Sequence, residues 1–275
     1  MSRFAKRLQF GSRRFSLADW DPSSTPGCRS QEEAAGRLAG NLSRIDELQY
    51  RLYAEARRSL LIVLQGMDTA GKDGVIRHVI SAFNPQGCRV WPFKAPSSEE
   101  ARHDFLWRIH RVAPARGEVA VFNRSHYEDV LVVRVHELVP EEQWSRRYDM
   151  INSFEKHLHQ HGTRVLKFFL HVGRDEQRRR LLARLEDPLK HWKFNEGDLA
   201  ERRRWKDYRR AYEDALVRCN KSHSPWHIVP ADHKWYRDLA ISEVIADALE
   251  DMDLKMPRVK LDVKALRAQL LGEKA

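Results

Sequence analysis

Five short apolar runs are spaced along the chain, at residues 60–65, 88–93, 118–122, 164–172 and 226–230. The first run reads LLIVL and is apolar at every position, which is typical of a strand buried on both faces of a parallel sheet. Each gap between runs is long enough to hold a crossover helix. The pattern therefore predicts an α/β fold with three α/β/α layers around a mainly parallel five-stranded sheet. Ligands are expected at the carboxyl ends of the strands.

The segments outside these runs have different characters. Residues 31–58 predict a helix, because apolar side chains recur at three- and four-residue steps: Leu38, Leu42, Ile45, Leu48 and Leu52. Residues 1–30 are basic and irregular, and we interpret them as an N-terminal arm over the surface. Residues 253–275 form a basic, weakly amphipathic C-terminal tail. We therefore expect one main domain over residues 31–252.

A glycine-rich segment, QGMDTAGKDG, follows the first apolar run. Gly66, Gly71 and Lys72 fit the phosphate-binding pattern G-x-x-x-x-G-K-[ST], in which backbone N–H groups cradle phosphate at the start of a helix. The last position is Asp73, where the pattern has a hydroxyl that ligates Mg²⁺. With Asp68 it places two carboxylates in a site built for anions, which makes sense chiefly if metal ions intervene. A strand-to-helix turn without a ligand is the alternative interpretation.

The composition narrows the choice of partners. The net charge is +10, which suits a polyanion such as nucleic acid, acidic lipid or a phosphate polymer. No run approaches the roughly 18 apolar residues that span a bilayer, and the N-terminus lacks an apolar signal core, so we expect a cytoplasmic protein with no membrane partner. The cysteines are odd in number and widely spaced, which favours neither a disulfide framework nor a zinc site: Cys28, Cys88 and Cys219.

The third apolar run ends in a second polar cluster, FNRSHYED. Phosphotransferases with this loop normally carry an acidic residue here that helps to hold Mg²⁺. Asn123 takes that place, and Glu128 is a candidate for the displaced carboxylate. Arg124 is a candidate phosphate ligand, because catalytic polar groups often follow a buried strand. In the alternative interpretation Ser125 is a helix N-cap and Glu128 completes its capping box, and both roles can hold together.

Residues 187–200, DPLKHWKFNEGDLA, interrupt the pattern and predict a loop between two helices. Cations on a hinged loop can neutralise a transferred phosphoryl group and then exclude water, so we interpret this segment as a lid. The candidate cations are Arg178, Arg184, Lys190 and Lys193. The run Arg202 to Arg204 is interpreted as a solvated helix face, because acidic residues lie at pairing distances. Trp192 and Phe194 either stack on a base or anchor the lid.

Six ordered motifs together resemble the polyphosphate kinase 2 family over about residues 35–252: GMDTAGKDG, FKAPS, HDFLWRIH, FNRSHYEDVLV, FFLHV and DPLKHWKFNEGDLAERRRWKDY. Asn123 with Glu128 resembles the branch called class III, whose members phosphorylate both AMP and ADP from polyphosphate. Other branches carry Asp and Asn at these two places. The resemblance implies a P-loop kinase fold of the thymidylate-kinase type for residues 31–252, with a helical lid at about 187–210. It also implies Mg²⁺ dependence, with Mn²⁺ as a substitute, and a basic channel for polyphosphate.

On this basis we expect transfer of a terminal phosphoryl group from inorganic polyphosphate to AMP, ADP or both, in a reaction that can run in reverse. The expected catalytic residues are Asp68, Lys72, Arg124, Glu128 and Arg178, with Asp68 and Glu128 as metal ligands. Phosphate and polyphosphate are expected to contact Gly66, Ala70, Gly71, Lys72, Asp73, Gly74, His126, Arg184, Lys190 and Lys193. The nucleotide is expected near Phe93, Lys94, Pro96, Asn123 and Arg124, although packing is an equally good interpretation of Phe93.

Two other functions fit part of the pattern. An ATP-dependent nucleotide kinase would use the same phosphate cradle. A basic module that binds RNA or DNA would explain the charge and would show salt-sensitive affinity, but the chain carries no recognisable nucleic-acid-binding motif, so we expect no nucleic-acid partner. We expect ATP as a product, guanine nucleotides as further substrates, and a homo-oligomer, either a dimer or a tetramer. The direction, acceptor preference, chain-length preference and the roles of residues 1–30 and 253–275 stay open.

Overall fold

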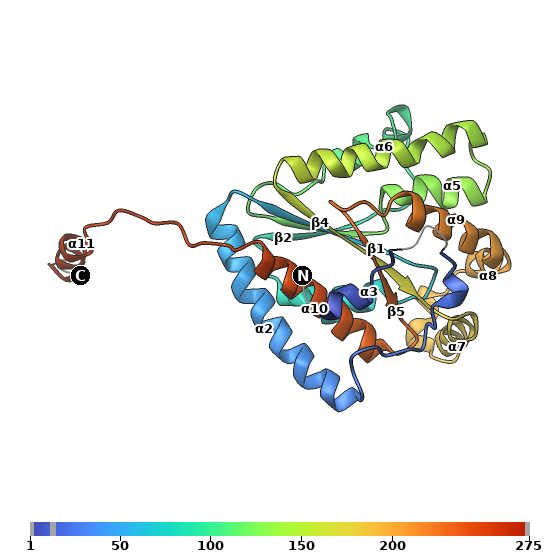
Figure 1. The fold of residues 1–275 in the computed structure, drawn as a ribbon, viewed down its shortest axis with the longest axis horizontal. Helices are drawn as coiled ribbons and strands as arrows, with labels where there is room; N and C mark the ends of the chain where they lie inside the picture. The colour runs from blue at the N-terminus through green and yellow to red at the C-terminus, as the bar shows by residue number, and fades with distance from the viewer. Residues whose placement is uncertain (1–2, 12–14, 273–275) are drawn as a thin grey trace.

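The computed structural model describes residues 3–11 and 15–272, and over this part of the chain it contains one five-stranded parallel sheet (Figure 1). The strand order is β2-β3-β1-β4-β5. The strands are β1 (Ser59–Gln65), β2 (Cys88–Pro92), β3 (Val119–Asn123), β4 (Thr163–His171) and β5 (Trp226–Pro230). They match the five predicted apolar runs to within one residue at each end, so the predicted α/β fold is confirmed. Every strand pair is parallel, and the carboxyl ends of β1 and β3 lie side by side.

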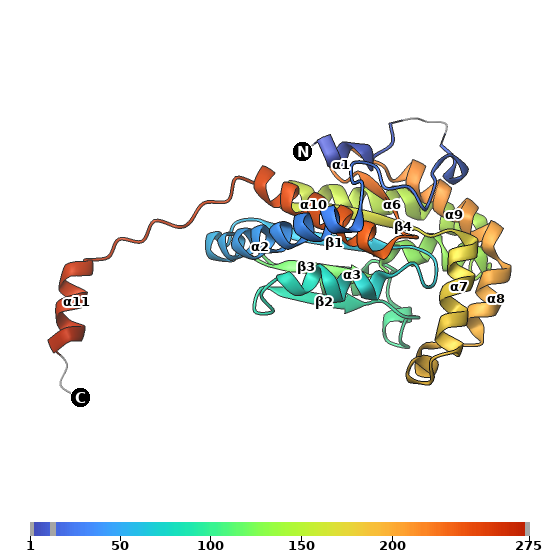
Figure 2. The same cartoon turned by 90° about the horizontal axis from the view of Figure 1, so that it is seen from below.

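Helices cover both faces of the sheet (Figure 2). One face packs against α1 (Arg3–Arg7), α2 (Gln31–Glu55), α3 (Lys72–His78) and α10 (Lys234–Asp251). The other packs against α4 (Trp107–His110), α5 (Val132–Val135), α6 (Glu141–Gln160) and α9 (Trp205–Arg218). Alternate side chains of β1 point into the two cores, so Leu60 and Ile62 face one and Leu61 and Val63 the other. This is why the whole strand is apolar.

The remaining helices lie at the two ends of the molecule (Figure 1). At one end, α7 (Arg174–Leu185) and α8 (Gly197–Arg203) project beyond the sheet, and at the other end α11 (Val263–Gly272) stands apart. Short 3₁₀ helices complete the described chain: η1 (Leu17–Asp19), η2 (Ile80–Ala82), η3 (Glu100–Arg102), η4 (His126–Val130) and η5 (Pro188–Lys193).

Helix α2 is shorter than predicted. Its start agrees with the sequence, because the Ser30 side chain accepts a hydrogen bond from the Glu33 N–H. It ends at Glu55, since Ala56 adopts a left-handed conformation with φ of 50°. The predicted apolar face is present, with Ile45 and Leu52 fully buried.

The N-terminal segment is more tightly integrated than the predicted surface arm. Residues 1, 2 and 12–14 of that arm lie outside the described residues. Ala5 and Leu8 are fully buried, and the Leu8 carbonyl accepts a hydrogen bond from the Ile228 N–H at 2.7 Å. The segment therefore covers the edge of β5, which would otherwise present unpaired backbone groups.

Two further expectations concern membranes and cysteines. In the part of the chain that the structure describes, no helix is long and apolar enough to cross a membrane. The three cysteines are free thiols, as their odd number and wide spacing predicted: Cys28, Cys88 and Cys219.

Candidate active site

The loop between β1 and α3 adopts conformations that require its glycines. Gly71 has φ of +106°, and a Cβ atom there would lie 2.0 Å from Nη1 of Arg237. Gly66 has φ of +156°, and a Cβ there would lie 2.8 Å from the carbonyl oxygen of Leu170. Arg237 is buried behind the loop and paired with Asp238 at 2.7 Å. The glycines of the phosphate-binding motif therefore have a steric reason in this fold.

Lys72 begins α3 and folds back under the loop. Its Nζ donates hydrogen bonds to the carbonyl oxygens of Gly66 at 2.7 Å and Met67 at 3.4 Å. Burial lowers the pKa of the ammonium group, with Arg124 acting in the same direction and Asp68 against it. Neutral carbonyls are weaker partners for a desolvated cation than an anion is. Lys72 is thus placed to bind a phosphate oxygen in the cradle.

Helix α7 fixes the loop from behind. Nη1 of Arg180 donates to the Thr69 carbonyl at 2.9 Å, and its Nη2 donates to the Ala231 carbonyl at 2.6 Å. Nε2 of Gln177 donates to the Asp68 carbonyl at 3.0 Å. These bonds hold the loop between β5 and α7, so its backbone is organised before any ligand binds.

The turn after β3 meets the loop at the edge of the sheet. Arg124 has φ of 62°, and its Nη2 lies 3.1 Å from Oδ1 of Asp68. Nδ2 of Asn123 donates to Oδ1 of Asp73 at 2.9 Å. The two predicted polar clusters therefore converge on one place, and Asn123 occupies a position where a carboxylate would repel Asp73.

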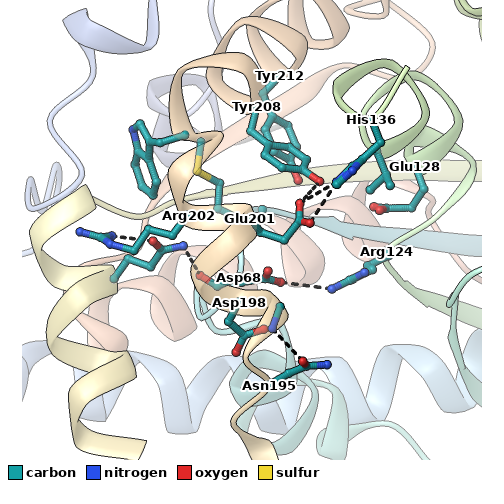
Figure 3. A pocket seen from close by; sticks show the side chains of 16 residues that line it. Asp68, Arg124, Glu128, His136, Asn195, Asp198, Glu201, Arg202, Tyr208 and Tyr212 are labelled. Carbon is teal, nitrogen blue, oxygen red and sulfur yellow. Dashed lines mark hydrogen bonds and ion pairs between the residues drawn. The ribbon is translucent and has the colours of Figure 1, made fainter. Parts of the chain in front are cut away.

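Ser125 and Glu128 divide the two roles that the sequence left open. Oγ of Ser125 accepts hydrogen bonds from the Tyr127 N–H at 3.2 Å and from Nε2 of Gln65 at 3.0 Å, so its predicted capping role is confirmed. Glu128 lines the cavity in front of the loop (Figure 3). Burial raises the pKa of the Glu128 carboxyl, and the charge of Arg124 opposes that rise.

A cavity of about 310 Å³ lies in front of the loop, at the carboxyl ends of β1 and β3 (Figure 3). The phosphate loop, the turn after β3, the end of α5 and the segment beyond α7 all contribute to it. Its lining includes four carboxylates and two arginines: Asp68, Glu128, Asp198, Glu201, Arg124 and Arg202. Alternating charges of this density suit a ligand with phosphate groups and bound cations.

The carboxylates fit a divalent cation that is shared with substrate. Burial, together with the nearby charge of Asp68, raises the pKa of Asp198, and a bound cation would relieve this repulsion. Mg²⁺ usually takes one or two carboxylates and completes its shell with phosphate oxygens and water. Within residues 3–11 and 15–272 no group of three His, Cys, Asp or Glu side chains could hold a metal ion. Asp68 and Glu128 therefore suit a cation whose remaining ligands come from phosphate.

The sequence interpretation missed several residues on the far wall of the cavity. Glu201 accepts a hydrogen bond from Tyr208 and lies 2.9 Å from Nε2 of His136, which joins α8 to the end of α5. Nη1 of Arg202 donates to Oε1 of Gln177 at 2.7 Å. Arg202 thus faces the cavity, and its interpretation as part of a solvated face was wrong. A signal was present, because cavity residues recur at four- and three-residue steps: Glu201, Trp205, Tyr208 and Tyr212.

The predicted lid segment reaches the cavity, but most of its predicted cations lie outside. The Arg178 side chain is 64% exposed and pairs with Asp175. Lys190 pairs with Asp187 at 2.6 Å, and Lys193 lies over the Trp192 ring at 4.9 Å. Arg184 is closer, with Nη1 3.4 Å from Oδ2 of the cavity residue Asp198. Contact between these cations and phosphate stays a prediction that requires the segment to move.

His126 points away from the cavity. Its ring is fully buried, with Nε2 3.3 Å from Oε1 of Glu155 on α6. Glu155 also binds Nζ of Lys167 at 2.6 Å and accepts from the Tyr127 hydroxyl at 2.8 Å. The prediction that His126 contacts phosphate is therefore wrong. The side chains of His126 and Tyr127 anchor the turn to the core, and those of Arg124 and Glu128 line the cavity.

The residues after β2 also lie outside the cavity. The Phe93 ring is buried edge-on against Phe122, with centroids 5.0 Å apart, and the Arg108 guanidinium lies over it at 5.5 Å. The packing interpretation of Phe93 therefore holds in this structure. Lys94 and Pro96 are exposed, and their predicted contact with a nucleotide stays a prediction.

Fold and site together define a class of protein. A phosphate loop with a buried lysine follows the first strand of a 2-3-1-4-5 parallel sheet, and a cation and carboxylates meet at the adjacent strand end. This is the arrangement of a P-loop phosphotransferase, which catalyses mainly by positioning and by neutralising charge.

Comparison with known proteins places the chain within that class. Residues 29–257 match the family model described as Polyphosphate kinase 2, and the chain belongs to this family. The ADP-polyphosphate phosphotransferase of Rhodopseudomonas palustris is 46% identical over 271 residues, covering 93% of this chain and 94% of the relative. The AMP/ADP-polyphosphate phosphotransferase of Meiothermus ruber is 46% identical over 246 residues, covering 89% and 92%.

A solved structure gives the same result. Polyphosphate Kinase 2 from Arthrobacter aurescens TC1 superposes with a TM-score of 0.95 at 46% identity, covering 99% of this chain and 98% of that chain. The expected P-loop kinase fold is thus confirmed. Kinases of this family require a divalent metal ion.

Proposed function

We propose that this protein transfers the terminal phosphoryl group of inorganic polyphosphate to AMP and ADP. The observation that carries the proposal is the convergence of Asp68, Lys72 and Arg124 at one edge of the sheet. Two cations and one carboxylate there can grip a phosphoryl group and orient it. The names of the relatives from Rhodopseudomonas palustris and Meiothermus ruber support polyphosphate as donor and AMP or ADP as acceptor.

The reaction is chiefly a problem of charge. Polyphosphate carries about one negative charge for each internal phosphate, so its approach to a nucleotide phosphate is repulsive unless cations screen it. We assign Lys72 and Arg124 to the transferred group. The backbone of the loop from Gly66 to Gly74, including Ala70, Gly71 and Asp73, cradles the donor. The +10 charge of the chain favours capture of the polymer at moderate ionic strength.

Asp68 and Glu128 would hold Mg²⁺, with Mn²⁺ as a substitute. When bound, the cation neutralises phosphate oxygens and orients them for in-line transfer. Asp68 is well suited to this role, because the backbone of its residue is held by Gln177 and its side chain already meets Arg124. Glu128 lies deeper in the cavity, where a cation between a short acceptor and the donor would compensate for the missing phosphate of AMP.

Segment 187–210 is proposed to close over the bound polymer. Glu201 and Arg202 link α8 to the end of α5 and to α7, which leaves the tip of the segment exposed. Closure would bring Lys190, Lys193 and Arg184 towards the donor, with Arg178 at the base. Such closure excludes water, which would otherwise compete with the nucleotide as acceptor.

A donor-exchange experiment tests the proposal. The purified protein is incubated with AMP and Mg²⁺, with either polyphosphate or ATP as the only donor, and the nucleotides are separated by chromatography. We expect ADP and then ATP to form from polyphosphate. Formation of ADP with ATP alone, and none with polyphosphate, would instead identify an ATP-dependent nucleotide kinase. Salt-sensitive nucleic-acid binding without either reaction would identify a binding module.

A further inference from the structure

The C-terminal segment leaves the body of the molecule and ends in a helix that packs on nothing nearby (Figures 1 and 2). Every residue from 255 to 272 is exposed. The helix nevertheless has a defined start, because Oδ1 of Asp262 accepts a hydrogen bond from the Ala265 N–H at 2.9 Å. An isolated helix of ten residues is marginal in water, so α11 needs a surface to pack against.

The segment carries the side chains of an interface. Val263, Leu266 and Leu270 share one face of α11 and are 67%, 43% and 69% exposed. Between residues 255 and 272 the chain has five cations and one carboxylate. The missing surface should therefore combine apolar groups with negative charge.

This chain itself offers such a surface, on α2 and α10. Helix α10 carries five carboxylates against two cations, and α2 carries five against three, although the chain as a whole is strongly basic. The outer face of α2 displays Asp46, Tyr50 and Tyr53, and the two tyrosine side chains are 62% and 49% exposed. Exposed tyrosines are among the residue types most enriched at binding hot spots.

The position of this surface suits reciprocal exchange between two copies. A groove of about 380 Å³ lies between the carboxyl ends of α2 and α10, where Leu48 and Leu254 line it. Met256, the first apolar residue of the segment, lines the same groove. Around a two-fold axis, a segment that leaves one copy here arrives at the same elements of the other copy.

We propose that residues 256–272 are a dimerisation arm that packs on the α2 and α10 surface of a second copy of this chain. The structure from Arthrobacter aurescens supports a fixed arm, because its alignment covers 99% of this chain and so leaves out only about three residues. A membrane is a poorer occupant, since α11 has no aromatic side chain to anchor it at an interface. The arm lies at the opposite end of the molecule from α8 and the cavity (Figure 1).

Sedimentation velocity on the full-length chain tests the arm. We expect the wild-type protein to sediment as a dimer or a multiple of one. Leu266→Asp with Leu270→Asp should reduce that species to half its mass or less and leave the circular dichroism spectrum of the body unchanged. The matched control is Leu138→Asp, at an exposed leucine on the loop before α6, which should leave the assembly intact. A wild-type monomer, or an assembly that survives the arm variant, would overturn the proposal.

A charge exchange identifies the surface that receives the arm. Lys264→Glu with Arg267→Glu on the arm, and Asp46→Lys with Glu47→Lys on α2, should each weaken self-association. Mixing the two variants should restore dimers that contain one copy of each, because opposite charges again face each other at one of the two contacts. Failure of the mixture to associate would overturn the assignment to α2. So would wild-type monomers that bind vesicles of acidic lipid through Leu266 and Leu270.

Discussion

Nη2 of Arg124 lies 3.1 Å from Oδ1 of Asp68, joining the turn after β3 to the phosphate loop. Both side chains are partly exposed, at 42% and 27%, so the pair contributes at most about 1 kcal/mol to folding. A contact this weak can be exchanged for stronger ones at low cost. We infer that phosphate takes over Arg124 and a cation takes over Asp68 when substrates bind.

The first prediction concerns Asp68. Asp68→Asn should abolish most phosphoryl transfer, because an amide is a poor ligand for Mg²⁺ and cannot neutralise a bound cation. The free energy of unfolding should change by less than about 1 kcal/mol, since only a partly exposed ion pair is lost. Steady-state rates over a range of Mg²⁺ concentrations, together with a urea unfolding curve, check both statements. Partial recovery at high Mg²⁺ would support the metal role, and full activity would remove Asp68 from the mechanism.

The second prediction separates the two roles of Glu128. Glu128→Asn should depress AMP phosphorylation more than ADP phosphorylation, because AMP brings one phosphate fewer to chelate the cation. A residue that only caps η4 would behave differently. Its loss would cost about 1 kcal/mol of stability and slow both acceptors equally. Values of kcat/KM for AMP and ADP, measured with the melting temperature, distinguish the roles, and an unchanged ratio would contradict acceptor selection.

The third prediction concerns the lid. Lys190→Ala with Lys193→Ala should raise the KM for polyphosphate more than the KM for the nucleotide, because both side chains face solvent until the segment closes. Lys156→Ala, an exposed lysine on α6, is the control and should change neither value. Hydrogen exchange at residues 187–200 should slow when polyphosphate and Mg²⁺ are added. Unchanged exchange in the wild-type protein would contradict closure.

The fourth prediction concerns stability in acid. Burial lowers the pKa of His227 from 6.5 to about 4, and the ring lies between the Lys167 carbonyl and the Gln9 amide. Below pH 6.5 the unfolded chain therefore binds a proton that the folded chain refuses until pH falls to about 4. Stability from this residue is full above pH 6.5 and is lost between these two values, by up to roughly 3 kcal/mol.

Urea unfolding at several pH values checks this sign. His227→Gln should flatten the fall in stability between pH 6.5 and 4, although buried His126, whose pKa burial also lowers, should retain part of the slope. His161→Gln, at an exposed position, is the control and should leave the slope unchanged. A slope that is identical in all three proteins would contradict the role of His227.

The strands and the phosphate loop could be predicted from the sequence because their signals are local. Each strand is an apolar run, and Gly66, Gly71 and Lys72 form one continuous motif whose conformation the glycines permit. The cations of the lid could not be ranked in this way. Arg202 and Lys190 look alike in sequence, but only the packing of α8 against α7 and α5 decides which side chain faces the cavity.

His126 illustrates a second limit. It lies two residues from Arg124 and from Glu128, so proximity in sequence predicted a shared role. The side chains of a tight turn diverge, however, and the buried carboxylate of Glu155 that receives His126 comes from a distant helix. No local pattern marks that partner. Glu201 and Tyr208 were predictable in principle from their helical spacing, which the dense charge around them obscured.

The most direct measurement of the central claim follows ³²P from labelled polyphosphate into AMP, with Mg²⁺ present and no ATP. The wild-type protein should place the label in ADP and then in ATP. Lys72→Ala should fold normally and slow the transfer by ~10²-fold or more, because the transition state loses a charge in the cradle. Lys156→Ala should transfer label at the wild-type rate. Absence of labelled nucleotide with the wild-type protein, or undiminished transfer by the folded Lys72→Ala variant, would contradict the account.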